Sequence, residues 1–375
     1  MSGRLSLRRG VVAAEDPLLI DVDGERRPAW IDVGLLGGVR RGDEVIVNVA
    51  ALDLGLGSGG FDIVHVNLTR GLSGAVRGAE HVMKLNYTSL QHPVEPVEAA
   101  AKGWNAGSIP VLVLPLHGHL APAAWATAQA LPGLKVGYIQ TAGGALPGSL
   151  SRDVLQLRDR GLLCAHITAA PAYGGEHEAL SVPGALDAAA HRLGWDAVLA
   201  APGPGIIGSN TRLGHGGMAV LESAHAALSL GMVTLISPRL SGAELRERHR
   251  GVSHHTLTVL TMLLSSVVVV LPEGSPEVRA ELTAEVRAEL AAVAEGRHQL
   301  HEAPADLAGY SATGLPAQTM GRRIEDDPLF FAAPLAAGRL LGVSAAAEPL
   351  AGGVEGAQTR GVGRDPTVGP ARRDA

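Results

Sequence analysis

The chain has 375 residues, 46% of them hydrophobic, which is enough to bury a sizeable core and to form two or three domains. A formal net charge of -6 disfavours nucleic acid as a general partner, and a single cysteine, Cys164, excludes a disulfide framework and a cysteine-based zinc site. No targeting signal is visible at the N-terminus, so we expect a cytoplasmic protein.

Residues 1–70 are predicted to form a small β-barrel or meander. Short apolar runs alternate there with turn signals such as Asp23-Gly24 and Gly42-Asp43, at the spacing of several short strands. Residues 71–109 are rich in glycine and polar groups, and we interpret them as a connecting region.

Residues 110–343 are predicted to form an α/β domain with C-terminal helices. Apolar strands are expected at 111–116, 135–140, 162–168, 196–201, 232–237 and 266–271. Helix-like segments lie between them, including 242–251, and a long charged helix is expected at 276–295. Strands that are apolar throughout indicate a parallel sheet covered by helices on both faces. Residues 344–375 have the composition of a disordered tail.

The uncharged run 256–272 requires a membrane test. It is shorter than the roughly 20 residues that a spanning helix needs, and it contains threonines and serines. We therefore expect a buried helix followed by a buried strand, and no membrane partner.

The loops that follow the strands carry the residues of chemical interest. Long, glycine-rich segments occur at 116–122, 141–148, 170–178, 203–217 and 237–242. Ligands of open α/β sheets bind beyond the carboxyl ends of the strands, so these loops predict a small-ligand site at that edge.

The segment 203–217 contains Gly203, Gly205 and Gly208 in the pattern GxGxxG, the form of a dinucleotide fingerprint. No helix is expected directly after it, and the next strand ends without an acidic residue for a ribose. We therefore favour an anion held by backbone N–H groups. Further donors would come from the side chains of Ser209, Asn210, Thr211 and Arg212, and from Thr141, Gly143 and Gly144 in the 141–148 loop. The alternative is that these glycines only let two segments pack closely.

A second candidate group lies in the segment RERHRGVSHHT at 246–256. His254, His255 or His249 would act as a general acid or base, and a histidine there would also suit a metal. Because neighbours on a helix point about 100° apart, we expect at most one of His254 and His255 to face a given site. Arg212 and Arg250 are the expected anion clamps, and Ser253 is expected to cap the following helix.

Other histidines permit a metal site without specifying one. His117 and His119, two residues apart, would form a mononuclear site with His215, His177 and Glu176. No fixed-spacing metal motif is present, so the metal and any cofactor stay undetermined.

Several blocks resemble a bacterial family known as domain of unknown function 3866. In chain order they are NVAALDLGLGSGG, KLNYTSLQ, TAGGALPG, GPGIIGSNTRLG and RHRGVSHHTLT, and the resemblance covers roughly residues 5–340. It implies one ordered architecture through the α/β part, and it implies no activity, cofactor or catalytic residue.

Three functions compete at this point. The first is binding of a small phosphorylated or nucleotide-like anion between the 203–217, 141–148 and 249–256 segments, by a transferase or hydrolase. The second is a non-catalytic regulatory protein whose barrel contacts a partner or RNA through the arginines at positions 4, 8, 9, 26, 27, 40 and 41. The third is a structural assembly component; the oligomeric state is open.

Overall fold

The computed structural model describes residues 4–56, 59–74, 80–100 and 109–346. It confirms the predicted fold class, a parallel α/β sheet with a small barrel before it. The disordered tail predicted for 344–375 falls, from residue 347 on, outside the described residues.

The barrel is closed by five strands in the order β1-β2-β3-β5-β4. These are β1 (Leu7–Glu15), β2 (Leu18–Val22), β3 (Glu25–Trp30), β4 (Glu44–Asn48) and β5 (Asp62–Asn67). All pairs are antiparallel except β3–β5. Alternate residues point inward, so Val12, Ile20, Val45, Val47 and Val64 form the barrel core. Two short helices, α1 (Val33–Leu36) and α2 (Ala50–Asp53), interrupt the strands.

The hairpin of β6 (Val82–Lys84) and β7 (His92–Val94) is anchored to the edge of the main sheet. The buried ammonium of Lys84 donates to the carbonyl oxygen of Thr168 at 2.9 Å and to the Glu178 carboxylate at 2.6 Å. This pairing fixes the connecting region against the α/β part.

The main sheet has eight parallel strands in the order β11-β10-β9-β12-β8-β13-β16-β17. The six predicted strands are β8 (Val111–Val113), β9 (Val136–Thr141), β10 (His166–Ala169), β12 (Ala197–Pro202), β13 (Thr234–Ile236) and β16 (Val268–Glu273). The edge strands β11 (His177–Ala179) and β17 (Gln299–Pro304) were not predicted. Both are largely polar and only partly buried, so they lack the apolar signal of the central strands.

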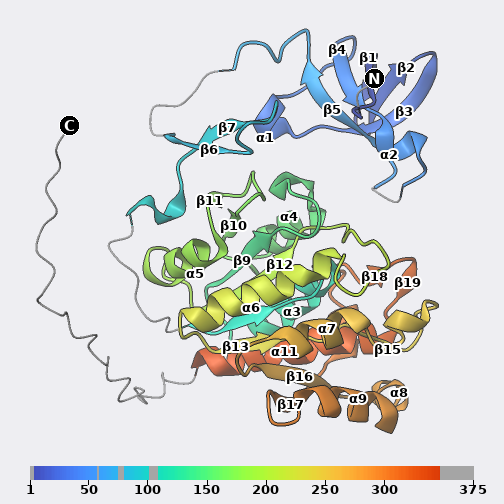
Figure 1. The fold of residues 1–375 in the computed structure, drawn as a ribbon. Coiled ribbons are helices and arrows are strands. Elements are labelled where there is room, and N and C mark those ends of the chain that lie inside the picture. Colours follow the sequence, from blue (N-terminus) through green and yellow to red (C-terminus); the bar gives the residue numbers. More distant parts are fainter. Residues whose placement is uncertain (1–3, 57–58, 75–79, 101–108, 347–375) are drawn as a thin grey trace, which may run out of the picture.

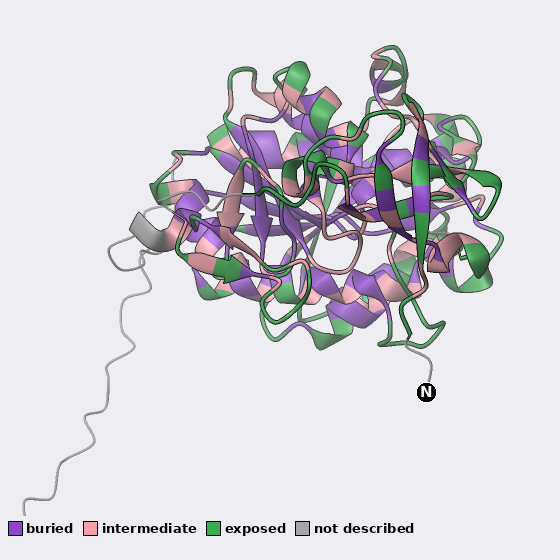
Figure 2. Cartoon of the chain, turned by 90° about the horizontal axis from the view of Figure 1, so that it is seen from above, coloured by how far each residue is buried: buried purple, intermediate pink, exposed green. Residues whose placement is uncertain are grey.

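Helices cover both faces of the sheet (Figures 1 and 2), and the strands between them are buried. One layer contains α5 (Val182–His191), α6 (Ala219–Ser229), α7 (His254–Met262) and α9 (Ala284–Ala294). The other contains α3 (Leu120–Ala130), α4 (Arg152–Asp159), α10 (Leu307–Ser311) and α11 (Pro328–Ala346). The central strands β8 and β12 send α3 and α6 to opposite faces, which makes their junction a topological switch point.

Two predicted helices were wrong. The segment expected as a helix at 242–251 instead links β14 (Leu240–Ser241) to β15 (Gly251–Val252), with one 3-10 turn at Glu247–His249. Its Glu244 side chain is buried among arginines from other segments, an arrangement that local sequence does not reveal. The helix expected at 276–295 is split into α8 (Pro276–Glu281) and α9, because Thr283 caps α9 by accepting the N–H of Val286.

Helix α11 is the central helix of one layer and packs closely on α3. It is long and apolar enough to cross a membrane by length and composition, but 67% of its most apolar window is buried inside the protein, as in a core helix. Gly338 makes the close crossing possible: a Cβ there would collide with the backbone carbonyl of Ala123. The Thr127 hydroxyl lies 2.8 Å from the Ala123 oxygen and 2.9 Å from the Gly338 oxygen, which ties the two helices together.

The Gly338→Ala substitution tests this crossing by the sign of its effect. Helix propensity alone would stabilise the protein by roughly 1 kcal/mol. The collision with Ala123 should instead destabilise it by about 1–3 kcal/mol, measured by urea unfolding. Gly38→Ala is the control, because Gly38 has open space and a negative φ. A Gly338→Ala variant as stable as the parent would contradict the proposed contact.

Candidate functional site

A cavity of about 630 Å³ lies at the switch point, beyond the carboxyl ends of β8, β12 and β13. This is the position expected for a ligand in an open α/β sheet, and the volume suits a small metabolite. The described lining residues come from five segments: Leu116–Gly118, Pro204–His215, Arg239–His249, His254–His255 and Gln318–Met320.

The 203–217 loop folds into a tight hairpin. Gly208 and His215 form an antiparallel bridge, and the Ser209 N–H donates to the Gly214 oxygen at 2.7 Å. Asn210 at the tip has φ 61, a left-handed conformation that asparagine tolerates. Helix α6 begins only at Ala219, so the loop lacks the direct entry into a helix that a dinucleotide fingerprint requires. The hairpin instead presents His215 at its end.

Glycines interlock this hairpin with the 141–148 loop. A Cβ on Gly143 would meet the carbonyl of Gly216, and one on Gly144 would meet the carbonyl of Gly203. Gly143 also has φ +105, which favours glycine. Close packing of two loops, the alternative considered from the sequence, is therefore what Gly143, Gly144 and Gly203 provide.

Four histidine rings gather on one wall of the cavity. His215 stacks on His255 with ring centroids 3.5 Å apart, and His254 lies 4.4 Å from His255. His249 lies 4.8 Å from His255. Both His254 and His255 line the cavity, although we expected at most one of them to do so. The reason is that the cavity lies at the N-terminal end of α7, where side chains from different sides of the helix reach it.

Ser253 caps α7, since its hydroxyl accepts the His255 backbone N–H at 3.3 Å. The same hydroxyl lies 2.7 Å from Nδ1 of His249. The Ser253 hydroxyl therefore both caps α7 and holds the ring of His249 in place.

Burial lowers the pKa of each of the four histidines. Burial, and after it the positive charge of Arg239, lower the pKa of His249 to about 3. Burial, and after it the neighbouring rings of His215 and His254, lower the pKa of His255 to about 2. Burial is also the main cause that lowers the pKa values of His215 and His254. All four imidazoles are therefore neutral at pH 7 and offer lone pairs or N–H groups, not positive charge.

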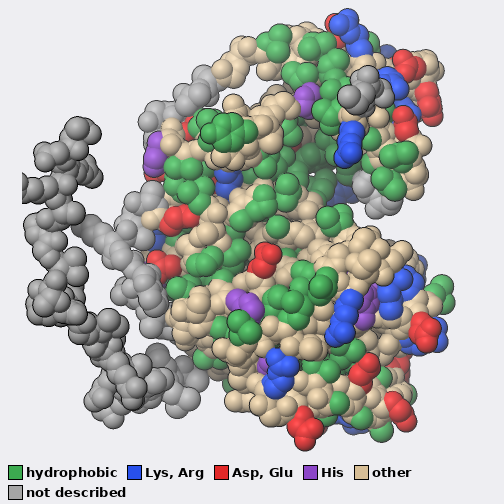
Figure 3. Space-filling model, in the orientation of Figure 1, with side chains coloured by type: hydrophobic (Ala, Val, Ile, Leu, Met, Phe, Trp, Pro, Cys, Tyr) green, Lys and Arg blue, Asp and Glu red, His purple; other side chains and the backbone are tan. Residues whose placement is uncertain are grey.

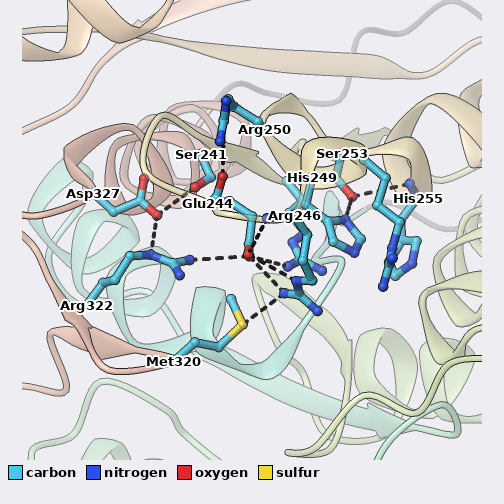
Figure 4. Close-up of polar contacts among 12 residues, drawn as sticks. Ser241, Glu244, Arg246, His249, Arg250, Ser253, His255, Met320, Arg322 and Asp327 are labelled. Atoms are coloured by element: carbon cyan, nitrogen blue, oxygen red, sulfur yellow. Dashed lines mark hydrogen bonds and ion pairs between the residues drawn. The ribbon is translucent and has the colours of Figure 1, made fainter. Parts of the chain in front are cut away.

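A buried ion-pair network borders the histidines (Figure 4). The Glu244 carboxylate accepts from Nε and Nη2 of Arg246 at 3.0 and 2.8 Å. Arg239 and Arg322 each place Nη2 3.5 Å from Glu244 Oε2. Arg322 comes from the hairpin of β18 (Gln318–Thr319) and β19 (Arg322–Arg323) and also binds Asp327 at 3.0 Å.

The network leaves positive charge at the cavity. Arg239, Arg246 and Arg248 line it, and no aspartate or glutamate does so among the described residues. Arg239 is buried, with an Nε atom that has no hydrogen-bond partner in the described part of the chain. Its burial lowers its pKa to about 10, which still keeps it charged at neutral pH. Figure 3 shows basic side chains next to a histidine where α7, β15 and the β18–β19 hairpin meet.

The structure brings only some of the predicted site residues together. Seven line the cavity: Gly205, Gly208, Asn210, Thr211, His249, His254 and His255. Eight do not: Thr141, Gly143, Gly144, Gly203, Ser209, Arg212, Arg250 and Ser253. The side chain of Arg212 is exposed. Its backbone carbonyl accepts the Nε2–H of His215 at 3.0 Å and so helps to hold that ring in place. The Arg250 guanidinium turns to the carbonyl of Glu244.

Sequence reasoning missed the three lining arginines. Arg239 carried a usable signal, because it lies two residues after Ser237 at the end of a predicted strand. Arg246 and Arg248 belong to the 246–256 segment that the sequence indicates as a candidate group, but nothing in the sequence separates them from Arg250, the arginine expected to bind the anion. Arg248 is held near the loop tip by a 2.7 Å hydrogen bond to Asn210 Oδ1.

The metal group considered from the sequence is not assembled. His117 lines the cavity but bonds Ser151 at 2.7 Å, and buried His119 lies 3.1 Å from the Ser237 hydroxyl. His177 and Glu176 line a separate cavity of about 510 Å³, between the barrel and the β11 edge. That cavity is bordered by carboxylates already used in the fold, such as Glu178 with Lys84.

The arginines of the barrel are largely ion-paired. Arg26 binds Asp21 at 2.9 Å, Arg27 binds Asp62 at 2.6 Å, and Arg8 and Arg9 also lie beside carboxylates. The hypothesis of a barrel partner or RNA stays a prediction, and the case for a ligand rests on the α/β sheet.

Comparisons with known proteins identify one family. The model of a family described as "Protein of unknown function (DUF3866)" matches residues 29–338. No curated protein and no solved structure matches the chain significantly.

The Glu244→Gln substitution tests the ion-pair network through its pH dependence. The hydrogen bonds from Arg246 lower the pKa of Glu244 from 4.5 to about 2. A carboxyl with a lowered pKa stabilises the fold above its ordinary pKa, and this contribution is lost as the pH falls toward 2. The variant should therefore be less stable than the parent by about 3 kcal/mol near neutral pH. This difference should shrink between about pH 5 and about pH 3.

Urea unfolding at several pH values measures that difference. Exposed Glu289→Gln is the matched control and should show little change at any pH. A difference between parent and Glu244→Gln that is the same at both ends of the range would contradict the network.

Proposed function

The chain belongs to the family described as protein of unknown function DUF3866, and we propose that it binds a small anionic ligand, phosphorylated or nucleotide-like, in the cavity at the switch point. The observation that carries the proposal is the charge of the lining: three arginines and no described carboxylate. Guanidinium groups bind phosphate and carboxylate oxygens through two parallel hydrogen bonds.

Arg239 is the strongest single element of the proposal. A buried charged donor without a partner costs free energy in the free protein. An anionic oxygen at Arg239 Nε would satisfy that donor and repay the cost. Arg248 is exposed, and its hydrogen bond to Asn210 Oδ1 holds it at the cavity, where it would bind the ligand from the solvent side.

The loop of β12 supplies the opposite wall. Pro204 to Gly208 line the cavity, and Gly205 and Gly208 carry no side chain, so an oxyanion has close access to their backbone N–H groups. Cavity size and lining together favour a ligand as large as a sugar phosphate or a nucleotide.

Hydrolysis or group transfer suits the site better than hydride transfer from a nicotinamide. The loop lacks direct entry into a helix, and β13 is followed by Ser237, Pro238 and Arg239 without a carboxylate for a ribose. Burial lowers the pKa values of His249, His254 and His255, so these neutral imidazoles are suited to donate an N–H hydrogen bond to a ligand oxygen rather than to accept a proton.

Binding is tested by thermal shift and calorimetry with nucleotides, sugar phosphates and inorganic pyrophosphate. A ligand at 100 times its dissociation constant should stabilise the protein by about 2.7 kcal/mol. Arg248→Ala should weaken binding roughly 10-fold or more, because a charge-assisted hydrogen bond contributes about 1.5–3 kcal/mol. Arg248 is exposed, so the variant should fold normally.

Arg212→Ala is the matched control, since Arg212 is equally exposed on the same loop edge but does not line the cavity. Its affinity should stay close to that of the parent. Equal losses in both variants would indicate only a general effect of charge, and a bound ligand insensitive to Arg248→Ala would place the site elsewhere.

A further inference from the structure

We propose that His215, His254 and His255 together hold one divalent transition-metal ion at the wall of the cavity. Each offers one ring nitrogen, and these three nitrogens all lie within 4.8 Å of one another. Two ligands of one tetrahedral ion, each about 2.1 Å from it, are about 3.4 Å apart. The rings of His215 and His255 are stacked at an interplanar angle of 8°, so one of them has to turn for three lone pairs to converge on one ion.

His215 is oriented as a metal ligand would be. Its Nε2–H donates to the Arg212 carbonyl at 3.0 Å, which leaves the lone pair on Nδ1. That Nδ1 is buried and has no hydrogen-bond partner in the described part of the chain. Metal-binding histidines typically donate their second ring N–H to a carbonyl or carboxylate, which fixes the tautomer and the ring. The hairpin of residues 208–215 therefore presents a free lone pair to the cavity.

His254 and His255 approach from the first turn of α7. Nε2 of His254 is also buried without a partner among the described residues. The ring centroids of His215 and His254 are 5.5 Å apart, and one ring nitrogen of each lies within 4.8 Å of one of His255. Two buried nitrogens without partners cost free energy, and a metal ion bound by both would remove that cost.

The ligand set selects the class of metal. Three imidazoles without a carboxylate favour Zn²⁺, Co²⁺ or Ni²⁺ over the oxygen-seeking Mg²⁺ and Ca²⁺.

Three ligands leave the fourth position of a tetrahedral ion open, as in catalytic sites. The three histidines line the same cavity as Arg239, Arg246 and Arg248, so we place the open position on the side of that cavity. This step rests on the proposed function: an oxygen of the bound phosphate completes the coordination while the guanidinium groups bind its other oxygens. His249, whose Nδ1 lies 2.7 Å from the Ser253 hydroxyl, is not one of the three proposed ligands and keeps its other ring nitrogen for the bound anion.

The test uses the full-length chain without a histidine tag, stripped of metal with a chelator and titrated with Co²⁺. Visible absorption reports four-coordinate Co²⁺ directly, and calorimetry gives the stoichiometry. We expect one ion per chain. His215→Gln and His254→Gln should each lower the affinity at least about 100-fold, because loss of an outer hydrogen-bond partner alone costs 10–100-fold.

His301→Gln is the matched control, since His301 is exposed on β17 at the far edge of the sheet. It should bind Co²⁺ like the parent. Circular dichroism shows whether each variant is folded, and the partly exposed His254 is the substitution best tolerated. Co²⁺ affinity that is equal in the parent and in both folded histidine variants would overturn the metal site.

Inorganic phosphate separates this proposal from the proposed function. Phosphate should change the Co²⁺ absorption of the parent, and Arg248→Ala should require a higher phosphate concentration for the same change. One Co²⁺ per chain with no response to phosphate would support the metal site and contradict the anion. Phosphate binding that depends on Arg248 without stoichiometric Co²⁺ would support the anion and overturn the metal.

Discussion

The buried carboxylate of Glu244 is the group around which this edge of the sheet is organised. A carboxylate cannot be buried without positive partners, and Glu244 takes three of them from separate places in the chain. Arg239 follows β13, Arg246 belongs to the same turn, and Arg322 reaches in from the β18–β19 hairpin. Arg322 also binds Asp327, whose carboxylate accepts from the Ser241 hydroxyl at 2.7 Å. The need to neutralise the buried carboxylates thus holds together the loop after β13, the β18–β19 hairpin and the start of α11, which form one wall of the cavity.

The opposite wall depends on the absence of side chains. The loops after β9 and β12 approach so closely that Gly143 and Gly216 allow no Cβ. This contact fixes the base of the hairpin that ends at His215, while Ser253 fixes the first turn of α7 with His254 and His255. The switch point of the sheet supplies the space between the walls. The histidines meet because two rigid pieces of backbone face each other there, not because they are neighbours in the sequence.

The sheet and its loop edge were predictable because the central strands are apolar on both faces and the unusual residues follow them. The barrel was predictable from its turns. The edge strands β11 and β17 were not, since polar edge strands lack that pattern. The segment 242–251 was mistaken for a helix because its buried Glu244 takes partners from outside the segment, Arg239 and also Arg322, which lies 78 residues away in the chain. Likewise, composition cannot tell whether an arginine faces a cavity, as Arg239 does, or solvent, as Arg212 does. Nor can it tell a glycine that lines a cavity, such as Gly205, from one that lets another loop approach, such as Gly143.

The two proposals are linked by electrostatics. The arginines favour neutral histidines, because a positive neighbour lowers the pKa of an imidazole, and neutral histidines are the form that binds a metal. The same arginines oppose a divalent cation at that position, because like charges at short distance repel in a partly buried site. An anion bound between the metal ion and the guanidinium groups is attracted by both and offsets the repulsion between them. Metal and anion should therefore each increase the affinity for the other by the same factor, as linkage requires. The positively charged cavity should therefore be most stable when the metal ion and the anion are bound together.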